Sequence, residues 1–256
     1  MKDLHFTLRM ASAMCFFGHG AFGMITKPIW CNYFGVFGIS QDLAYHLMPV
    51  VGTVDILLGL SLLLYPTRAV LIWLVAWGSF TALLRPLSGE SIGEFIERAG
   101  NYGAPLALLL LSGQRPWWSR LDAHPQPDKA QFNRFVGCLR VVVFLILLGH
   151  GWLNWIEKKS LLAQYAALGF SNPAGVAHSV GVFEMTAAVM LLIRPLRPLL
   201  LILFVWKTGT ELFYPHWEVF EWIERSGSYG SLLALWLALG KNKPSIIHNN
   251  QILSAL

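Results

Sequence analysis

The chain carries the same order of landmarks twice, and this duplication constrains its fold more than any other feature. A shift of about 130 residues aligns the two copies. A Gly-His-Gly triplet occurs at 18–20 and again at 149–151. VGTVD at 51–55 matches VGVFE at 180–184, and EFIERAGNYG at 94–103 matches EWIERSGSYG at 221–230. Because the order is kept throughout, we interpret the chain as a tandem duplication of one unit.

Composition indicates that lipid surrounds this unit. Of 256 residues, 55% are hydrophobic and only 13% are charged, whereas soluble proteins carry about a quarter charged residues. One bilayer crossing needs about 20 mostly apolar helical residues. Near-continuous apolar runs lie at 10–25, 43–65, 69–84, 104–111, 135–156, 174–193, 199–213 and 231–239. We therefore expect an all-α, polytopic integral membrane protein with eight transmembrane helices in two parallel-repeat four-helix bundles.

The domain boundaries follow from the same pattern. We expect a first four-helix repeat at 1–114, a polar and Pro-rich cytoplasmic linker at 115–134, and a second repeat at 135–256. An even number of crossings per repeat makes the two copies parallel, related by a pseudo-two-fold axis along the membrane normal. Lysine and arginine are more frequent in the segments on the side of the termini, which predicts that both termini are cytoplasmic.

The ERxGxYG motif precedes the fourth apolar run of each copy, which is too short to cross a bilayer alone. The motif should therefore form the outer part of one continuous spanning helix that starts near Glu94. On such a helix Glu94, Arg98 and Tyr102 share one face. Charges at this depth should pair with each other or with a neighbouring helix. The residues expected in structural ion pairs are Glu94, Glu97, Arg98, Glu221, Glu224, Arg225, Lys207 and Glu211.

Two interpretations of these charges stay open. They form a buried lock that holds the helices together, or Arg98 and Arg225 donate hydrogen bonds to an anionic or carbonyl ligand. Lys207 and Glu211 occur only in the second copy, where the first copy has Gly78 and Ala82. The sequence therefore leaves open which repeat holds a working site.

A polar layer is predicted near the middle of the membrane. Counted from the outer ends of their helices, His19, Asp55 and Tyr102 lie about 12–15 Å deep. The second copy repeats this layer with His150, Glu184 and Tyr229. A carboxylate at this depth needs a partner, and the histidine of each copy is the obvious one.

Three interpretations of the histidine–carboxylate pair are considered. It is a structural hydrogen bond, or a proton-handling and quinone-binding pair, or a haem ligand set formed by His19 and His150, which is the least favoured. The three cysteines show no metal-ligand spacing, and no metal site is expected. The sequence has no nucleic-acid module, and it identifies no catalytic residue. Trp30 and Tyr33, at a predicted helix end, are interpreted as interfacial anchors.

Two segments of each half form a recognisable pattern. They are GHGAFGMITKP and VVGTVDILLGLSLLLYPTRAVLI in the first half, and GHGWLNWIEK and SVGVFEMTAAVMLLIRPLRPLLL in the second. In this pattern each half resembles the DoxX-like family of small four-helix bacterial membrane proteins. The resemblance implies an antiparallel four-helix bundle in the bacterial inner membrane, often associated with redox complexes. That group includes the small subunit of a thiosulfate:quinone oxidoreductase.

The leading hypothesis is thus a redox-associated membrane protein that binds a quinone-like or other lipophilic small molecule in a polar intramembrane pocket. Its expected partners are the lipid bilayer, that molecule and subunits of a membrane redox complex. One alternative is a proton-coupled transporter or permease, for which duplication and midplane charges are typical. Another is a non-catalytic membrane subunit of a larger complex, in which the polar layers only hold helices together.

Overall fold

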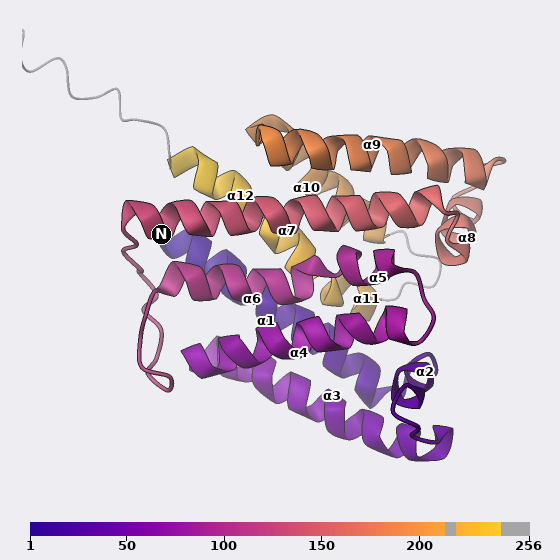
Figure 1. Cartoon of the computed structure of the whole chain (residues 1–256), viewed down its shortest axis with the longest axis horizontal. Coiled ribbons are helices and arrows are strands. Elements are labelled where there is room, and N and C mark those ends of the chain that lie inside the picture. Colours follow the sequence, from indigo (N-terminus) through magenta and orange to yellow (C-terminus); the bar gives the residue numbers. More distant parts are fainter. Residues whose placement is uncertain (213–218, 242–256) are drawn as a thin grey trace, which may run out of the picture.

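The computed structural model describes residues 1–212 and 219–241, and this part of the chain is built of α-helices (Figure 1). The first half contains α1 (Lys2–Met24), α2 (Trp30–Gly35), α3 (Gln41–Leu64), α4 (Arg68–Leu87), α5 (Ile92–Glu97) and α6 (Ala99–Ser112). The second half contains α7 (Lys129–Trp155), α8 (Lys159–Ala167), α9 (Pro173–Ile193), α10 (Arg197–Leu212), α11 (Val219–Glu224) and α12 (Ser226–Lys241). The element order of the second half therefore repeats that of the first.

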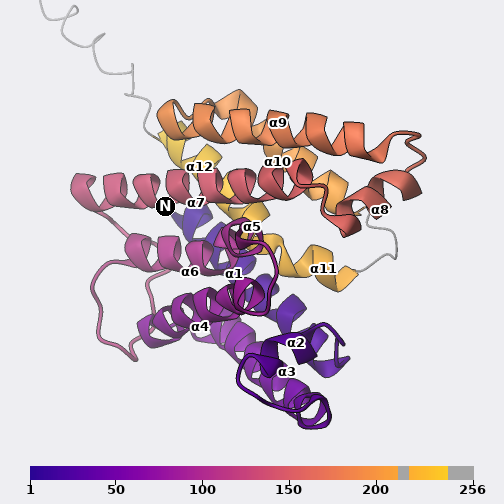
Figure 2. The ribbon, with the colours of Figure 1, turned by 45° about the vertical axis from the view of Figure 1, so that its right-hand side comes forward.

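The long helices run roughly along one direction, and the short ones gather at one end. In Figures 1 and 2 the N-terminus and the linker lie at the opposite end from α2 and α8. The end of α12 returns to the start of α1, where Lys241 Nζ lies 3.7 Å from Asp3 Oδ2. Both halves thus begin at the same end of the molecule and run in parallel.

Local sequence fixes where these helices begin. Ser40 and Thr67 cap α3 and α4, and Asn172 caps α9, whose first residue is Pro173. Each cap side chain accepts a hydrogen bond from a backbone N–H that the first helical turn leaves without a partner. Ser91 caps α5 in the same way.

In the described residues, four helices are long and apolar enough to cross a membrane: α3, α4, α7 and α9. Large apolar side chains such as Leu57 and Ile193 are exposed on them, at 58% and 75%. Contiguous exposed apolar surface of this kind is rare on soluble monomers. An all-helical chain with four such helices is a membrane protein.

The two halves are not packed as separate bundles. Helix α1 packs along α3 of its own half and along α11 and α12 of the other half. Helix α7 likewise packs along α9 and along α5 and α6. One hydrophobic core joins both halves, with Leu8 and Leu108 in the same cluster as Leu139 and Leu235. The sequence boundary between the repeats is therefore not a boundary between packed units.

Glycines allow helices of the two halves to pack closely against each other at the centre of the molecule. A Cβ added to Gly100 would lie 2.5 Å from the backbone nitrogen of Ser228, and one added to Gly227 would lie 2.5 Å from the carbonyl oxygen of Gly100. Gly18 and Gly149 lie equally close to the backbone of Glu224 and Glu97. Only residues without a side chain allow the backbones of the two halves to approach so closely.

Three boundaries differ from the sequence prediction. The helix expected to run unbroken from Glu94 is interrupted at Arg98, between α5 and α6, and the second half is interrupted at Arg225. After each break the backbone forms a tight i→i+3 turn, from Asn101 N to Arg98 O and from Ser228 N to Arg225 O, both 2.9 Å. In addition, α7 begins at Lys129, inside the segment predicted as linker.

Candidate functional site

The buried carboxylate of the first half is held by a histidine and a tryptophan. His19 Nδ1 on α1 lies 2.6 Å from Asp55 Oδ2 on α3. Trp77 Nε1 on α4 donates to Asp55 Oδ1 at 2.8 Å. Asp55 is 0% exposed, so two donors satisfy its two oxygens in a place that water does not reach.

Small residues bring α1 and α3 close enough for this contact. A Cβ on Gly23 would lie 2.6 Å from the carbonyl oxygen of Met48, and Gly20 and Gly52 meet in the same way. The glycines beside the histidine in the sequence motif therefore serve helix packing, as small residues do between membrane helices.

The second half repeats the pair and adds a lysine. His150 Nδ1 forms a hydrogen bond with Glu184, which is 0% exposed. Lys207 Nζ lies 3.6 Å from Glu184 Oε1 and 3.6 Å from Glu211 Oε1. Asn154 donates to the carbonyl oxygen of His150 at 3.0 Å. The site around His150 thus contains more polar groups than the corresponding site around His19.

The two tyrosines of the predicted layer lie elsewhere. The Tyr102 ring stacks on Phe95, with centroids 5.6 Å apart, and Tyr102 packs against the cluster that contains Val142. The Tyr229 hydroxyl is buried and forms no hydrogen bond within the described residues. Tyr229 lines a small cavity beside Lys207 rather than the His150–Glu184 pair.

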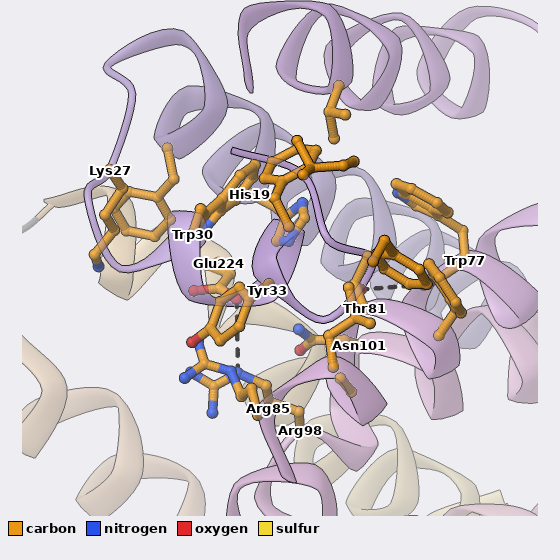
Figure 3. Close-up of a pocket in the computed structure, with 18 residues that line it drawn as sticks. His19, Lys27, Trp30, Tyr33, Trp77, Thr81, Arg85, Arg98, Asn101 and Glu224 are labelled. Carbon is orange, nitrogen blue, oxygen red and sulfur yellow. Dashed lines mark hydrogen bonds and ion pairs between the residues drawn. The ribbon is translucent and has the colours of Figure 1, made fainter. Parts of the chain in front are cut away.

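A pocket of about 150 Å³ lies beside His19, between α1, α2 and α4 and near the end of α11 (Figure 3). Its polar lining comprises His19, Lys27, Tyr33, Thr81, Arg85, Arg98, Asn101 and Glu224. Its apolar lining is dominated by aromatic side chains: Phe22, Trp30, Phe34, Phe37, Trp77 and Phe80. An aromatic wall with a few converging polar groups is typical of small-molecule sites.

Trp30 and Tyr33 are pocket residues, so their interpretation as interfacial anchors was wrong. They are only 6% and 8% exposed because α2 folds back against α3 and α4. The Trp30 ring lies 4.7 Å from that of His19. Tyr33 donates to Glu90 Oε1 at 2.7 Å, and burial raises the pKa of its phenol. The guanidinium of Arg85 lies 5.3 Å from the Tyr33 ring centroid, and Figure 3 shows the two side chains together.

The charges of the two ERxGxYG motifs pair within and across the halves. Within its own half, Arg98 NH1 lies 3.0 Å from Glu94 Oε2. Across the halves, Arg225 NH1 donates to Glu97 Oε1 at 2.6 Å, and Arg98 Nε lies 4.0 Å from Glu224 Oε1. The lysine that follows the first helix of each half also pairs with a carboxylate of the other half.

These crossing lysine pairs are Lys27 with Glu221 and Lys158 with Glu94. Together with the arginine pairs they form one buried cluster, which we call the ion cluster. It links α5 and α6 to α11 and α12 at the same level as the pocket. A pattern within one helix could predict which charges share a face, but not that their partners lie in the other repeat.

In the second half, the space around the histidine and the arginine is divided between two cavities. There, a cavity of about 220 Å³ adjoins His150 and is lined by Gln164, Tyr165 and Trp206. A separate cavity of about 10 Å³ adjoins Lys207 and Arg225. Because Lys207 and Glu211 replace Gly78 and Ala82, their side chains stand between the histidine and the arginine. In the first half one pocket reaches both.

Comparison with protein-family models, curated proteins and solved structures gave no match to the chain. The resemblance to DoxX-like proteins therefore stays a prediction. Within residues 1–212 and 219–241 there is no group of three or more His, Cys, Asp or Glu side chains that could hold a metal ion. Fold and site thus define an all-helical membrane protein with a buried ion cluster and an aromatic polar pocket.

Proposed function

We propose that the protein binds a quinone-like head group of a lipophilic molecule in the pocket beside His19, as a redox-associated membrane protein of the DoxX-like type. The observation that supports this most is the composition of the pocket wall. Aromatic rings form its sides, and His19, Arg98 and Asn101 converge in it from different helices. These groups can donate hydrogen bonds, so they suit a ring that carries acceptor oxygens.

The size of the pocket supports a single ring. An engineered cavity of about 150 Å³ in another protein takes up one benzene molecule, and this pocket has a volume of about 150 Å³. A hydrophobic tail would then lie outside it. Phe37 and Phe80 line the pocket and are also 55% and 41% exposed. They mark a route by which a tail could pass from the pocket to the lipid without crossing water.

His19 and Asp55 would supply the proton chemistry of this site. With Nδ1 on the carboxylate, the second ring nitrogen of His19 is left to face a ligand. A histidine beside a carboxylate is a common proton donor and acceptor near neutral pH. Arg98 would hold nearby carboxylates in place and donate to the head group, whereas Tyr102 lies outside the pocket wall.

The wider proposal includes eight membrane crossings: α1, α3, α4, α5 with α6, α7, α9, α10, and α11 with α12. It places the protein in the bacterial inner membrane, with both termini in the cytoplasm. The N-terminus and the linker lie at one end of the molecule (Figure 1), which agrees with this topology. The residues after 241 lie outside the described part. Subunits of a membrane redox complex are the proposed protein partners.

A transporter is the second candidate, because two spanning segments are interrupted. The breaks at Arg98 and Arg225 lie beside the pocket and the ion cluster. Interrupted helices at corresponding positions of two repeats are typical of secondary transporters. The ion cluster disfavours transport, because it joins the two repeats that would have to move relative to each other.

Two measurements test the binding function. The first is mass spectrometry of the organic extract from protein purified in native-lipid nanodiscs, beside a mock preparation. The second is titration with a short-chain benzoquinone, followed by quenching of tryptophan fluorescence, since Trp30 and Trp77 line the pocket. We expect a stoichiometric quinone in the extract and saturable quenching, with at least tenfold weaker binding in His19→Gln.

His46→Gln is the matched control, because His46 is exposed on α3. It should bind as the wild type does. Bulk lipid alone in the extract, together with non-saturable quenching in the wild type, would contradict the proposal. Substrate-dependent flux into liposomes under those conditions would favour the transporter instead.

A further inference from the structure

Four aromatic side chains form a stacked row that leads out of the pocket beside His19. Trp73, Trp77 and Phe80 share one face of α4, and Phe37 joins them from the segment after α2. The ring centroids lie 6.0 Å apart for Phe37 and Phe80, 5.7 Å for Phe80 and Trp77, and 6.1 Å for Trp77 and Trp73. We call these four side chains the aromatic row.

The aromatic row connects the pocket to the surface of α4 that faces lipid. Phe37, Phe80 and Trp77 line the pocket, whereas Trp73 lies beyond it. Figure 3 shows Trp77 on the side of the pocket opposite Lys27. Trp73 is 51% exposed, and α4 is long and apolar enough to cross a membrane. A molecule whose head group fills the pocket can therefore lay a tail along the row without entering water.

The position of the row within α4 differs from that of an interfacial anchor. Tryptophan side chains of membrane proteins gather near the ends of their helices, at the level of the lipid head groups. Trp77 and Phe80 instead lie well inside α4, which spans Arg68–Leu87. The indole N–H of Trp77 donates to Asp55 Oδ1 at 2.8 Å, which fixes this ring in place. The rings stacked on either side of it are thereby held in position before a tail binds.

The second half lacks this row at the corresponding positions of α10. Of the three α4 positions only the middle tryptophan is repeated, because the corresponding residues are Ile202, Trp206 and Gly209. Ile202 is 59% exposed and Trp73 is 51% exposed, so exposure alone does not account for the aromatic side chain. The row occurs in the half that has the aromatic pocket.

A stacked row of rings favours a tail that contains double bonds. The Trp77 ring plane lies 15° from that of Trp73 and 28° from that of Phe80, so the rings cover one another's faces and leave their edges outward. The edge of an aromatic ring is positive and its face is negative. The π electrons of a carbon–carbon double bond are therefore attracted to the row, whereas a saturated chain has none. A double bond also prevents rotation, so such a tail loses less conformational entropy on binding.

We propose that the pocket and the aromatic row together select a molecule with an isoprenoid tail, which has a double bond and a methyl branch in every repeating unit. This inference rests on the proposed function, because the head group has to occupy the pocket beside His19. The first units of the tail then lie along the row toward Trp73. Trp73 determines specificity through the tail alone, since it lies outside the pocket.

Three benzoquinones with the same ring separate the head group from the tail. One has no tail, one has a geranyl tail, and one has the hydrogenated form of that tail, which keeps the carbons and branches but not the double bonds. Each is titrated into protein in nanodiscs and followed by quenching of tryptophan fluorescence. The Kd of a variant is compared with that of the wild type for the same compound, so that partition of the compound into lipid cancels.

In Trp73→Leu we expect the geranyl compound to bind about fivefold more weakly, through loss of one aromatic contact. The hydrogenated and the tail-less compounds should bind within about twofold of the wild type, which also shows that the variant is folded. Trp73→Phe keeps a ring in the row and should restore most of the affinity for the geranyl compound.

Phe183→Leu is the matched control. Phe183 on α9 is 42% exposed and contacts Trp206, but it belongs to the half without the row, so all three compounds should bind as they do to the wild type. Equal weakening of the geranyl and hydrogenated compounds in Trp73→Leu, or no weakening of either, would overturn the inference. Failure of the wild type to bind any of the three compounds would instead contradict the proposed function.

Discussion

The two halves have the same order of helices, but they differ at two positions on the corresponding helices α4 and α10. Gly78 and Ala82 in the first half leave one pocket that extends from His19 to Arg98. Lys207 and Glu211 in the second half fill that space and leave a large cavity on one side and a very small one on the other. The difference indicates that the first half kept room for a ligand, while the second half uses the same place for additional ion pairs.

The ion cluster, in contrast, is nearly the same in the two halves. Each repeat supplies an arginine and a lysine to the carboxylates of the other. A change in one of these residues would leave a buried charge without its partner in the other repeat. The two halves thus carry the same charged residues where each half pairs with the other. They differ on α4 and α10, which pack against helices of their own half.

The largest expected effect comes from breaking the cluster. Glu97→Gln should lower the free energy of unfolding by about 3 kcal/mol, because it removes a buried carboxylate that pairs with both Arg225 and Arg98. Glu224→Gln should cost clearly less, since Arg98 lies 4.0 Å from Glu224 but Arg225 lies 2.6 Å from Glu97. Unfolding by SDS in mixed micelles measures both.

Glu157→Gln is the control for this comparison. Glu157 pairs with His178, but both side chains are nearly half exposed, so its loss should change stability by less than about 0.5 kcal/mol. Equal losses in Glu97→Gln and Glu224→Gln would show that the two crossing pairs contribute alike, despite their different lengths.

Adding a methyl group where the backbones of the two halves meet should have the next largest effect on stability. Gly100→Ala and Gly227→Ala each place a Cβ about 2.5 Å from backbone of the opposite half. Overpacking of this kind costs about 1–3 kcal/mol, and the two variants should lose similar amounts in the same SDS titration. Gly137→Ala on α7 is the matched control, since its Cβ meets nothing within 4 Å. Loss in one variant alone would contradict the pseudo-symmetric contact.

Transplanting the second-half residues into the first half tests why the pockets differ. The double variant Gly78→Lys with Ala82→Glu adds no net charge and should fill the pocket beside His19. We expect at least tenfold weaker quinone binding, or about 1.4 kcal/mol, in the fluorescence titration. The reverse variant, Lys207→Gly with Glu211→Ala, should bind quinone at the first pocket as the wild type does. Unchanged binding in the first variant would mean that the pocket is not the site.

Sequence patterns predicted the all-helical fold and the pairing of each histidine with its carboxylate, because each depends on order along the chain and on depth within a helix. His19 with Asp55 and His150 with Glu184 are therefore found as predicted. The same reasoning failed to place Tyr102, because equal depth does not mean that two side chains point toward each other.

The exchange of partners between halves could not be predicted from one sequence. Two similar repeats offer each arginine carboxylates in its own half and in the other, and both kinds of pair are formed. The pairs across the halves depend on which helices meet, and the backbones of the two halves meet at Gly100 and Gly227. The burial of Trp30 and Tyr33 was also missed, since a tryptophan or tyrosine at a helix end is typical of an interfacial anchor until α2 is seen to fold inward.

The smallest effect on stability concerns Tyr33, and its size depends on pH. Burial raises the pKa of its phenol above the ordinary value of about 10. The folded protein then holds a proton that the unfolded chain releases, so stability should fall as the pH rises above about 10. Gln164, at the corresponding place in the second half, donates to the carbonyl oxygen of Thr210 and does not titrate. Tyr33→Phe keeps the buried ring and removes the hydroxyl that titrates. It should lower stability at pH 7 by only about 1 kcal/mol, through loss of the hydrogen bond to Glu90, and flatten the decline of stability between pH 10 and pH 11 in the SDS titration. An identical decline in the variant and the wild type would show that other groups, and not this phenol, cause the loss of stability in alkali.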